Sequence, residues 1–348
     1  MYAEAKPATF YDLESPVDQT RLTAPMVELG RLSGLVIVDE AQRMPALFEI
    51  LRVLVDRPEK KAKFLLLGSA SPHIVKGVSE SLAGRIGFVD LSGFGLTEIG
   101  ANHWRSLWLK GGFPLSYLAN TLEDSWLWRD QFMRTFLERD IPQLGFSIPT
   151  DALRRFWTMV AHYHGQVWNA AEFARSMGTS EGTARRYLDL LSGAFMIRAL
   201  PPWHENLKKR QVKAPKIYVR DPGLLHSLLG LQDEQSLMGN PKMGASWEGF
   251  MIEQLLAVLR VREAYFWATY AGAELDLLVM MRGRRIGFEI KFSDAPRMTK
   301  SLAIAQKDLK LDQAYIIYPG TTRYALSDTL CATPLDQPFM EELSEMAE

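Results

Sequence analysis

Hydrophobic and polar positions alternate along the chain with two different periods. From about residue 8 to 98, short apolar runs such as 35–38 and 64–67 alternate with stretches of helical period such as 46–56. Buried strands separated by helices are typical of a parallel sheet with crossover helices. The pattern therefore predicts an α/β domain in this first region.

The pattern changes three more times. Between 99 and 165, aromatic-rich amphipathic helices are separated by the Gly-Gly-Phe-Pro run at 111–114 and by Pro149. From 166 to 235, two short helical patterns precede basic and β-like stretches, and then an amphipathic helix at 247–260 is followed by two adjacent apolar strands. We therefore expect an α/β multidomain protein with four parts: 1–98, 99–165, 166–235 and 236–348.

Composition and charge narrow the class of protein. The sequence has 348 residues, 47% hydrophobic and 23% charged, which is the balance of a folded globular protein with more than one core. A net charge of -1 gives no overall attraction to nucleic acid, so such binding would need local basic patches. The single cysteine, Cys331, excludes an internal disulfide and a multi-cysteine zinc site. Without a signal peptide or a membrane-length apolar run, we expect a cytoplasmic protein that does not enter a membrane.

Acidic residues follow the apolar strand at 35–38. In P-loop NTPases, an acid in the position of Asp39 helps to hold Mg²⁺, and an acid in the position of Glu40 orients the attacking water. Ser69 follows the next strand, where a polar sensor of the γ-phosphate would lie, and Arg85 is a candidate for stabilising phosphate charge. Four apolar residues before two acids also occur by chance, so a plain strand end and a solvated arginine remain alternatives.

The phosphate-binding loop of such enzymes does not occur in this sequence. Its pattern, G-x-x-x-x-G-K-[ST], supplies the backbone N–H groups and the lysine that hold the phosphates. The residues before Asp39 predict only one strand and one helix. Two interpretations follow: the strand and its phosphate loop lie upstream of Met1, or the chain does not hydrolyse nucleotide by itself.

A known family carries a similar series of motifs. The segments VIVDEAQRMPALFEILRVLVD, FLLLGSAS, ESLAGRI, LWLKGGFP, WRDQFMRTFLERDI and KAPKIYVRDPGLL, in this order, resemble prokaryotic AAA+-type ATPases that carry a C-terminal domain of unknown function with an endonuclease-like fold. The resemblance implies a partial P-loop NTPase core with a helical lid at 99–165. It implies that Asp39 and Glu40 are the Walker B pair and Ser69 the sensor, that ATP and Mg²⁺ are cofactors, and that the chain forms a homo-oligomer.

Two short helical patterns at 169–178 and 181–195 resemble a helix-turn-helix. A winged-helix-like module of this kind would expose Thr183 and Arg186 toward a DNA groove. Basic residues of the following segment would supply phosphate contacts: Lys208, Lys209, Arg210, Lys213 and Lys216. Such folds also serve as protein-binding or interdomain modules, and a run of lysines is usually a solvated face, so both interpretations stay open.

The C-terminal region carries the most informative pattern. Nucleases of the restriction-endonuclease-like type place an acid on one strand and Glu-x-Lys on the next, so that the acids hold Mg²⁺ and the lysine positions or activates water. Asp276, Glu289 and Lys291 follow this order as D-x12-E-x-K. Glu248, on the preceding helix, resembles the additional acid of such sites, although an exposed helical residue is the plain alternative. We therefore predict a restriction-endonuclease-like domain at 236–348 with a metal site at Asp276 and Glu289.

The loop between the two apolar strands determines whether these side chains converge. A two-residue turn at Gly283-Arg284 would place Asp276 opposite Lys291 and turn both, with Glu289, to one face of the sheet. A three-residue loop would turn Asp276 to the opposite face.

Two hypotheses for function follow. The first is an enzyme that processes DNA with Mg²⁺ and is related to AAA+ ATPases. The second is a catalytically inactive regulatory chain that binds DNA or protein.

Overall fold

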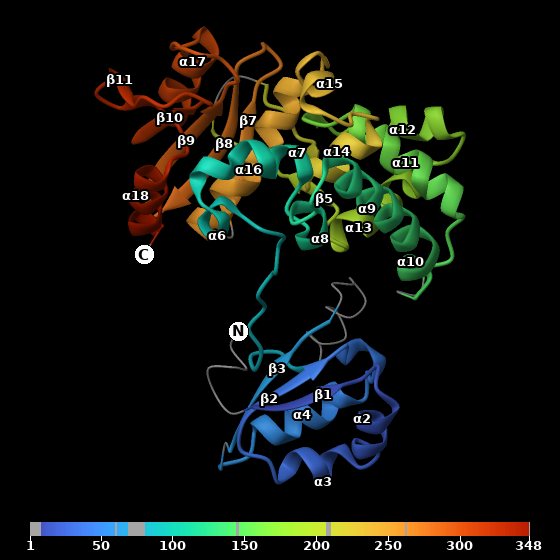
Figure 1. Cartoon of the computed structure of the whole chain (residues 1–348). Helices are drawn as coiled ribbons and strands as arrows, with labels where there is room; N and C mark the ends of the chain where they lie inside the picture. The colour runs from blue at the N-terminus through green and yellow to red at the C-terminus, as the bar shows by residue number, and fades with distance from the viewer. Residues whose placement is uncertain are drawn as a thin grey trace. The chain divides into compact units, whose positions relative to one another are not determined.

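The computed structural model of the chain describes residues 8–59, 61–68, 81–143, 146–206, 210–261 and 263–347. These residues form two compact units with separate cores, the first ending at Asp90 and the second beginning at Leu91 (Figure 1). Among them, no helix has the length and apolar character that a bilayer crossing requires.

The first unit is built on a parallel sheet with the strand order β1-β2-β3. Leu47, Leu51 and Leu54 recur at helical spacing in helix α4 and are buried in the core of this unit. The α/β prediction for this region is confirmed, with two short helices between β1 and β2 where we expected one. The elements are β1 (Ala8–Asp12), α2 (Pro16–Arg21), α3 (Pro25–Gly30), β2 (Gly34–Asp39), a 3-10 turn (Ala41–Arg43), α4 (Leu47–Val55) and β3 (Ala62–Leu66).

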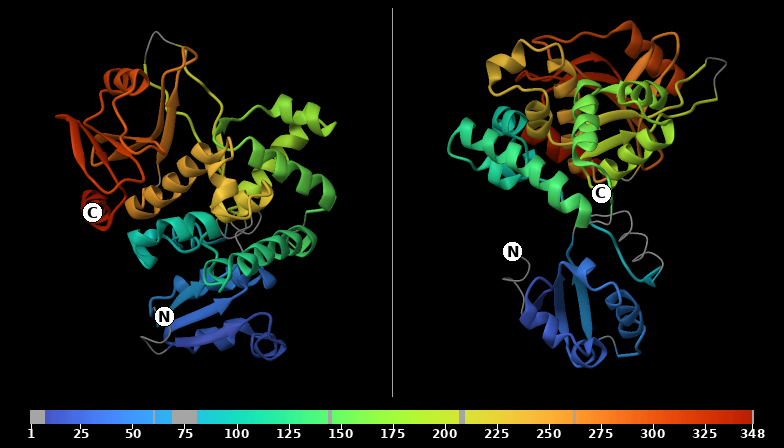
Figure 2. Two further views of the ribbon diagram at one scale, coloured as in Figure 1. Left: turned by 45° about the horizontal axis from the view of Figure 1, so that its top comes forward. Right: turned by 90° about the vertical axis from the view of Figure 1, so that its right-hand side faces the viewer.

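The second unit contains a mixed sheet with the strand order β11-β12-β10-β9-β8-β7. Helices α16 and α18 cover one face of this sheet and α17 covers the other (Figures 1 and 2). The chain runs through its centre in the order α16, β7, β8, β9, α17, β10. The elements are α16 (Met243–Leu259), β7 (Ala264–Ala268), β8 (Glu274–Met281), β9 (Arg284–Ile290), α17 (Lys300–Leu309), β10 (Gln313–Ile317), β11 (Tyr324–Ser327), β12 (Leu330–Thr333) and α18 (Gln337–Ala347).

The helices that precede this sheet pack around a small antiparallel sheet with the order β4-β6-β5. The two predicted short helices are confirmed as α12 and α13, whose first turns are capped by the side chains of Asn169 and Ser180. Gly178 ends α12 with a φ of 66°, which a side chain would disfavour. The elements are α6 (Leu96–Ile99), a 3-10 turn (Ala101–His103), α7 (Trp104–Lys110), α8 (Pro114–Tyr117), α9 (Leu122–Thr135), a π-helical turn (Phe136–Asp140), α10 (Ile141–Gln143), α11 (Thr150–His162), β4 (Gln166–Val167), α12 (Ala170–Met177), α13 (Glu181–Gly193), β5 (Ile197–Leu200), β6 (Lys216–Val219), α14 (Pro222–Leu228) and α15 (Glu234–Met238).

The connection from β5 to β6 joins the small sheet to the large one. The backbone N–H of Trp203 donates to Phe266 at 2.7 Å, and that of Val212 donates to Ala268 at 3.0 Å. Both acceptors lie in β7, at the edge of the large sheet. In a winged helix, the hairpin that follows the second helix reaches toward DNA as a wing. In this chain, Trp203 and Val212 of the corresponding connection are paired with β7 instead.

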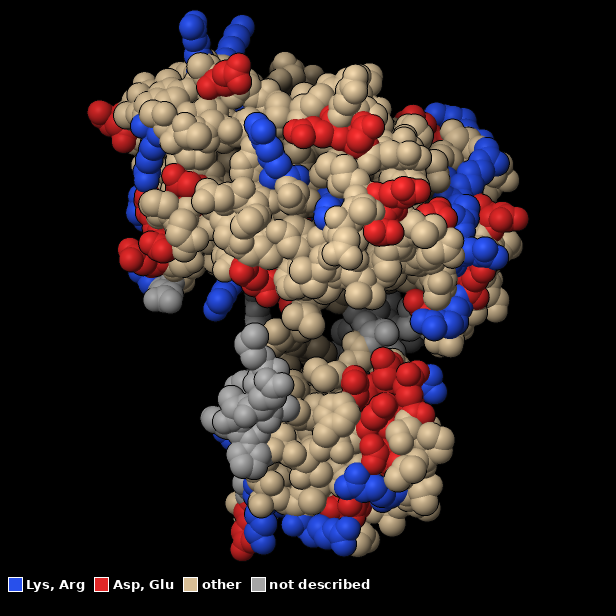
Figure 3. All heavy atoms as spheres, in the orientation of Figure 1, with Lys and Arg blue, Asp and Glu red and all other residues tan. Residues whose placement is uncertain are grey.

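The surface near α11 and α12 carries charges of both signs. In Figure 3, Lys and Arg side chains gather over this end of the second unit, with Asp and Glu among them. Arg186 is exposed on α13, whereas Arg185 of the same helix lies 3.6 Å from Glu181. Arg185 is thus paired within its own helix, whereas Arg186, the predicted DNA contact, is exposed.

A buried histidine connects three helices of the second unit. His226 of α14 lies 2.7 Å through Nε2 from Ser246 Oγ of α16, and Trp108 of α7 donates to the same oxygen at 2.9 Å. Burial lowers the pKa of His226 to about 3, because a charged imidazole would lose its hydration there.

This pKa predicts a loss of stability in mild acid. Below pH ~6.5 the unfolded chain takes up a proton that folded His226 does not, so the free energy of unfolding falls by up to about 1.4 kcal/mol per pH unit from this group. Between pH 7 and pH 5, urea denaturation should therefore show about 2 kcal/mol less loss in His226→Asn than in the wild type. Equal losses in the two proteins would contradict this assignment.

Candidate functional site

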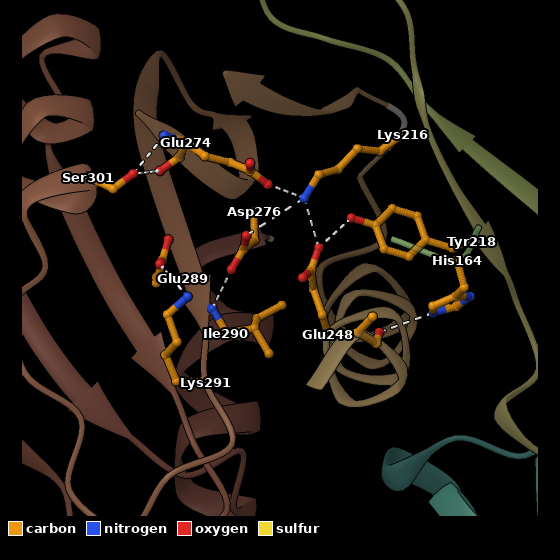
Figure 4. Close-up of polar contacts among 11 residues, drawn as sticks. His164, Lys216, Tyr218, Glu248, Glu274, Asp276, Glu289, Ile290, Lys291 and Ser301 are labelled. Atoms are coloured by element: carbon orange, nitrogen blue, oxygen red, sulfur yellow. Dashed lines mark hydrogen bonds and ion pairs between the residues drawn. The ribbon is translucent and has the colours of Figure 1, made fainter. Parts of the chain in front are cut away.

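Acidic side chains of the second unit gather where β8 begins. Glu248 comes from α16, and Glu274 and Asp276 come from β8. One carboxylate oxygen of each lies within 4.8 Å of the others, which is close enough for the three to hold one cation (Figure 4). Glu274 was not identified from the sequence, because a charged residue at the first position of a strand normally indicates a solvated end.

The hairpin between β8 and β9 differs from the predicted one. Met281 pairs with Arg284, so the two-residue turn consists of Arg282 and Gly283, with φ values of 48° and 77°. Two positive φ values define a type I′ turn, which prefers glycine in its second central position. The turn predicted at Gly283-Arg284 is therefore wrong, and the pairings derived from it shift with it.

The position of Asp276 does not follow from simple alternation. The register of β8 against β7 shifts between Tyr265 and Trp267, next to this residue. The carboxylate is held instead by the backbone of β9, because Ile290 N–H donates to its Oδ2 at 2.8 Å. This bond brings Asp276 close to Glu289, and Figure 4 shows both among the acids of the cluster.

Glu289 and Lys291 form an ion pair at the end of β9. The Lys291 ammonium donates to Glu289 Oε1 at 2.8 Å, and 43% of the lysine side chain is exposed. Glu289 itself is buried, and its Oε2 has no hydrogen-bond partner among the described residues. Burial raises the pKa of Glu289, although Lys291 opposes this shift. An unpaired buried carboxylate oxygen is costly, and it is a free ligand position.

A lysine from another sheet lies among these acids. The Nζ of Lys216 is 3.0 Å from Glu248 Oε1 and 4.0 Å from Asp276 Oδ1, and it also contacts the carboxylate of Glu274. The predicted role of Lys216 as a surface phosphate contact is wrong, because only 4% of the residue is exposed. Its position at the start of β6, a strand with four buried residues, is the signal that could have indicated this.

Tyr218 and Lys216 together stabilise the charge of Glu248. The Tyr218 hydroxyl donates to Glu248 Oε1 at 2.6 Å. Burial alone would raise the pKa of Glu248, but the Lys216 ammonium and this hydroxyl hold it below its usual range. Burial would likewise lower the pKa of Lys216, but the charge of Glu248 raises it well above its usual range. Both groups therefore remain charged near neutral pH.

The site contains more carboxylates than ammonium groups. Among the described residues, Glu248, Glu274, Asp276 and Glu289 form ion pairs within the cluster with Lys216 and Lys291. Burial and the charges of Glu248 and Glu289 raise the pKa of Asp276 well above its usual range. Oxygen ligands with excess negative charge and the free Oε2 of Glu289 fit a divalent cation such as Mg²⁺ or Mn²⁺.

The predicted nucleotide-binding acids lie at one edge of the sheet in the first unit. Asp39 is the last residue of β2, and Glu40 follows it with a left-handed φ of 52°. The backbone N–H of Glu40 donates to Asp39 Oδ1 at 3.0 Å, and the Glu40 carboxylate accepts from the Gln42 amide. The carboxyl edge of a parallel sheet is where nucleotides bind in such folds. Ser69 lies outside the described residues.

Arg85 is not brought to this edge. It forms a two-point ion pair with Asp56, at 2.7 Å and 2.8 Å. Asp56 follows α4, which returns the chain from the carboxyl edge of β2 to the amino edge of β3. Arg85 thus lies at the edge opposite to Asp39 and Glu40.

The predicted nucleic-acid contacts come from two segments of the second unit. Lys208 and Lys209 lie outside the described residues, and Lys213 is exposed. The Arg210 guanidinium lies 5.3 Å from the centre of the Tyr270 ring, next to the edge of the large sheet. These residues belong to the connection that pairs with β7, whereas Arg186 lies on α13.

This chain resembles known protein families and two mycobacterial proteins along most of its length. Residues 2–100 match an AAA domain, 101–235 match a domain of unknown function (DUF8612), and 243–337 match another domain of unknown function (DUF4143). The chain is 52% identical over 337 residues to uncharacterized protein Rv2008c of Mycobacterium tuberculosis and to uncharacterized protein Mb2031c of Mycobacterium bovis, covering 97% of this chain and 76% of each relative. The chain therefore belongs to the same family as these mycobacterial proteins, with an AAA domain at its N-terminus and DUF4143 at its C-terminus.

Proposed function

We propose that the C-terminal domain is a divalent-metal-dependent nuclease with a restriction-endonuclease-like fold. One observation carries this proposal: Glu248, Asp276, Glu289 and Lys291 come from one helix and from two neighbouring strands, or the residue directly after them, to a single cluster. The succession of α16, three antiparallel strands, α17 and a parallel strand supports it, because it orders the acid and the Glu-x-Lys on adjacent strands.

The residues divide the chemistry of phosphodiester hydrolysis between them. Asp276 and Glu289 would hold the metal ion, with Glu248 and Glu274 as further acids, because oxygens of Glu248, Glu274 and Asp276 lie within 4.8 Å of one another and Oε2 of Glu289 has no partner among the described residues. When bound, such an ion polarises the scissile phosphate and acidifies its water ligand. Lys291 is the cation that can meet the substrate, because 43% of its side chain is exposed while Glu289 fixes its ammonium. Its positive charge would stabilise the charge that develops on the phosphate oxygens.

DNA cleavage by the purified full chain tests this function. Supercoiled plasmid, single-stranded DNA and branched DNA are incubated with Mg²⁺ or Mn²⁺, and a chelator should abolish cleavage. Lys291→Ala should lower the rate by about 100-fold or more, as expected for the loss of a charge that acts on the reacting phosphate. Lys307→Ala, an exposed lysine of α17, should cleave like the wild type. No cleavage, or equal cleavage by wild type and Lys291→Ala, would refute the proposal.

The alternative is a chain that binds DNA or protein without cutting it. The position of Lys216 favours this alternative, because its ammonium already lies among the acids that would bind a metal ion. The helix-turn-helix arrangement of α12 and α13 with the β4-β6-β5 sheet would then supply a winged-helix-like binding module, with Arg186 exposed on it. DNA binding without cleavage in the same assay would support this alternative.

We also propose that the AAA domain binds Mg²⁺ with ATP through Asp39 and Glu40, in a homo-oligomer of the kind that this class of domain forms. The place of the two acids directly after β2, at the carboxyl edge of the sheet, supports this assignment. Asp39→Asn should then remove any Mg²⁺-dependent nucleotide binding seen with the wild type.

A further inference from the structure

Lys216 lies where a cation bound by the acidic cluster would lie. Its ammonium touches the carboxylates of Glu248 and Glu274 and is 4.0 Å from Asp276 Oδ1. These are the same three acids whose oxygens lie within 4.8 Å of one another. Figure 4 shows Lys216 reaching them from the opposite side to Glu289 and Lys291.

Strand pairing fixes the backbone of Lys216, and its side chain is buried. Lys216 belongs to the central strand of the small sheet and pairs with Val167 on one side and with Leu200 on the other. Its Nζ lies 5.8 Å from the centre of the Phe266 ring, and 5% of the side chain is exposed. The ammonium can leave the cluster only if the side chain rotates or if β6 moves away from β8.

A second observation indicates that the cluster accepts further positive charge. Glu289 is only 4% exposed, and its Oε2 has no hydrogen-bond partner among the described residues. Lys291 neutralises one charge and Lys216 another, while four carboxylates are present. The two lysines therefore leave ligand capacity for one more cation.

We propose that Lys216 sets the cation affinity of this site, because its ammonium competes with a divalent metal ion for the oxygens of Glu248, Glu274 and Asp276. The inference rests on the proposed function only in taking this cluster as the metal site. An ammonium and a metal ion use the same carboxylate lone pairs, and two cations repel strongly at this separation. The wild-type chain then binds metal tightly only when Lys216 is displaced.

Calorimetric titration of the full chain with Mn²⁺ tests the proposal. Lys216→Met keeps the length of the side chain and removes its charge, and we expect it to bind Mn²⁺ at least tenfold more tightly than the wild type. Lys213→Met carries the same change at an exposed position of the same segment and should bind like the wild type. Adding Asp276→Asn to Lys216→Met should remove the gain, which separates this site from metal binding at Asp39 and Glu40.

Folding gives a second readout, because Lys216→Met leaves buried acids without their counter-ion. Mn²⁺ should raise the unfolding temperature of Lys216→Met more than that of the wild type, and it should restore folding if the variant is unfolded without metal. Equal or weaker Mn²⁺ affinity in Lys216→Met, or an unfolded variant that Mn²⁺ does not restore, would overturn the proposal.

The two proposals fail in different ways. If Lys216→Met binds Mn²⁺ tightly and no protein cleaves DNA, the nuclease function is wrong and the role of Lys216 stands. If the wild type cleaves DNA and Lys216→Met gains no affinity, the role of Lys216 is wrong and the nuclease function stands.

Discussion

Replacing Asp276 by asparagine is expected to lower metal-dependent DNA cleavage by about 100-fold or more and, at the same time, to make the folded chain more stable at pH 8. The activity falls because a neutral amide is a much weaker ligand for a divalent cation than a carboxylate, and about 2.7 kcal/mol of lost transition-state stabilisation corresponds to 100-fold in rate. The hydrogen bond from Ile290 N–H survives, because the asparagine oxygen accepts it in place of Oδ2.

The gain in stability follows from the crowding of buried carboxylates around Asp276. Burial and the neighbouring charges of Glu248 and Glu289 raise the pKa of Asp276 well above its usual range. For an acid with a raised pKa in the folded state, stability is highest below the unfolded pKa of ~3.9 and is lost as pH rises toward the folded value. Asparagine removes this loss, so we expect Asp276→Asn to be more stable than the wild type at pH 8.

Urea denaturation at pH 8 and pH 5 measures this effect. The gain of Asp276→Asn over the wild type should be larger at pH 8, because the destabilisation by this acid accumulates as pH rises from the unfolded pKa toward the raised folded pKa. Asp328→Asn, at an exposed position, should change stability by less than about 0.5 kcal/mol at either pH. A less stable Asp276→Asn that still cleaves DNA would show that this carboxylate is structural.

The proximity of Asp276, Glu289 and Lys291 could be predicted from the sequence, because these residues lie on or directly after adjacent strands. The order of Asp276, Glu289 and Lys291 depends only on two neighbouring strands, and such strands pair locally. The apolar run that follows Lys216 could indicate the burial of this lysine, but not its partners. Lys216 belongs to another sheet, and only the packing of β6 beside α16 and β8 brings its ammonium to the acids. Contacts of this kind depend on tertiary structure, which no local pattern encodes.

The same distinction explains which parts of the fold could be predicted. Helices α12 and α13 carry their own start and stop signals in Asn169, Gly178 and Ser180, so their positions could be inferred locally. The hairpin could be inferred, but its register depends on a positive φ at Arg282, a residue type that rarely adopts one. The order of β10, β12 and β11 depends on which strands meet after α17, and periodicity alone does not determine it.

The start of α14 is packed against the backbone of Lys110 and Gly111, more closely than a side chain at this position would allow. A Cβ built on Gly223 would lie 2.6 Å from the carbonyl carbon of Lys110 and 2.8 Å from the nitrogen of Gly111. Asp221, which caps α14, also accepts a hydrogen bond from Gly112 N–H at 2.7 Å. Because the obstructing atoms belong to backbone, they cannot move aside without separating the two segments.

Gly223→Ala is therefore expected to destabilise the second unit by about 3 kcal/mol or more, since it adds the strain of an overpacked contact to the loss of the partly buried hydrogen bond between Gly112 and Asp221. Urea denaturation at pH 7 measures the change. Gly244→Ala, in helix α16, is the matched control, because its Cβ meets nothing within 4 Å. Alanine should raise stability there by about 0.5 kcal/mol through its better helix propensity. Similar effects of the two substitutions would mean that α14 is not held by this contact. A selective loss in Gly223→Ala would reach the acidic cluster as well, because α14 packs against α16, the helix that carries Glu248.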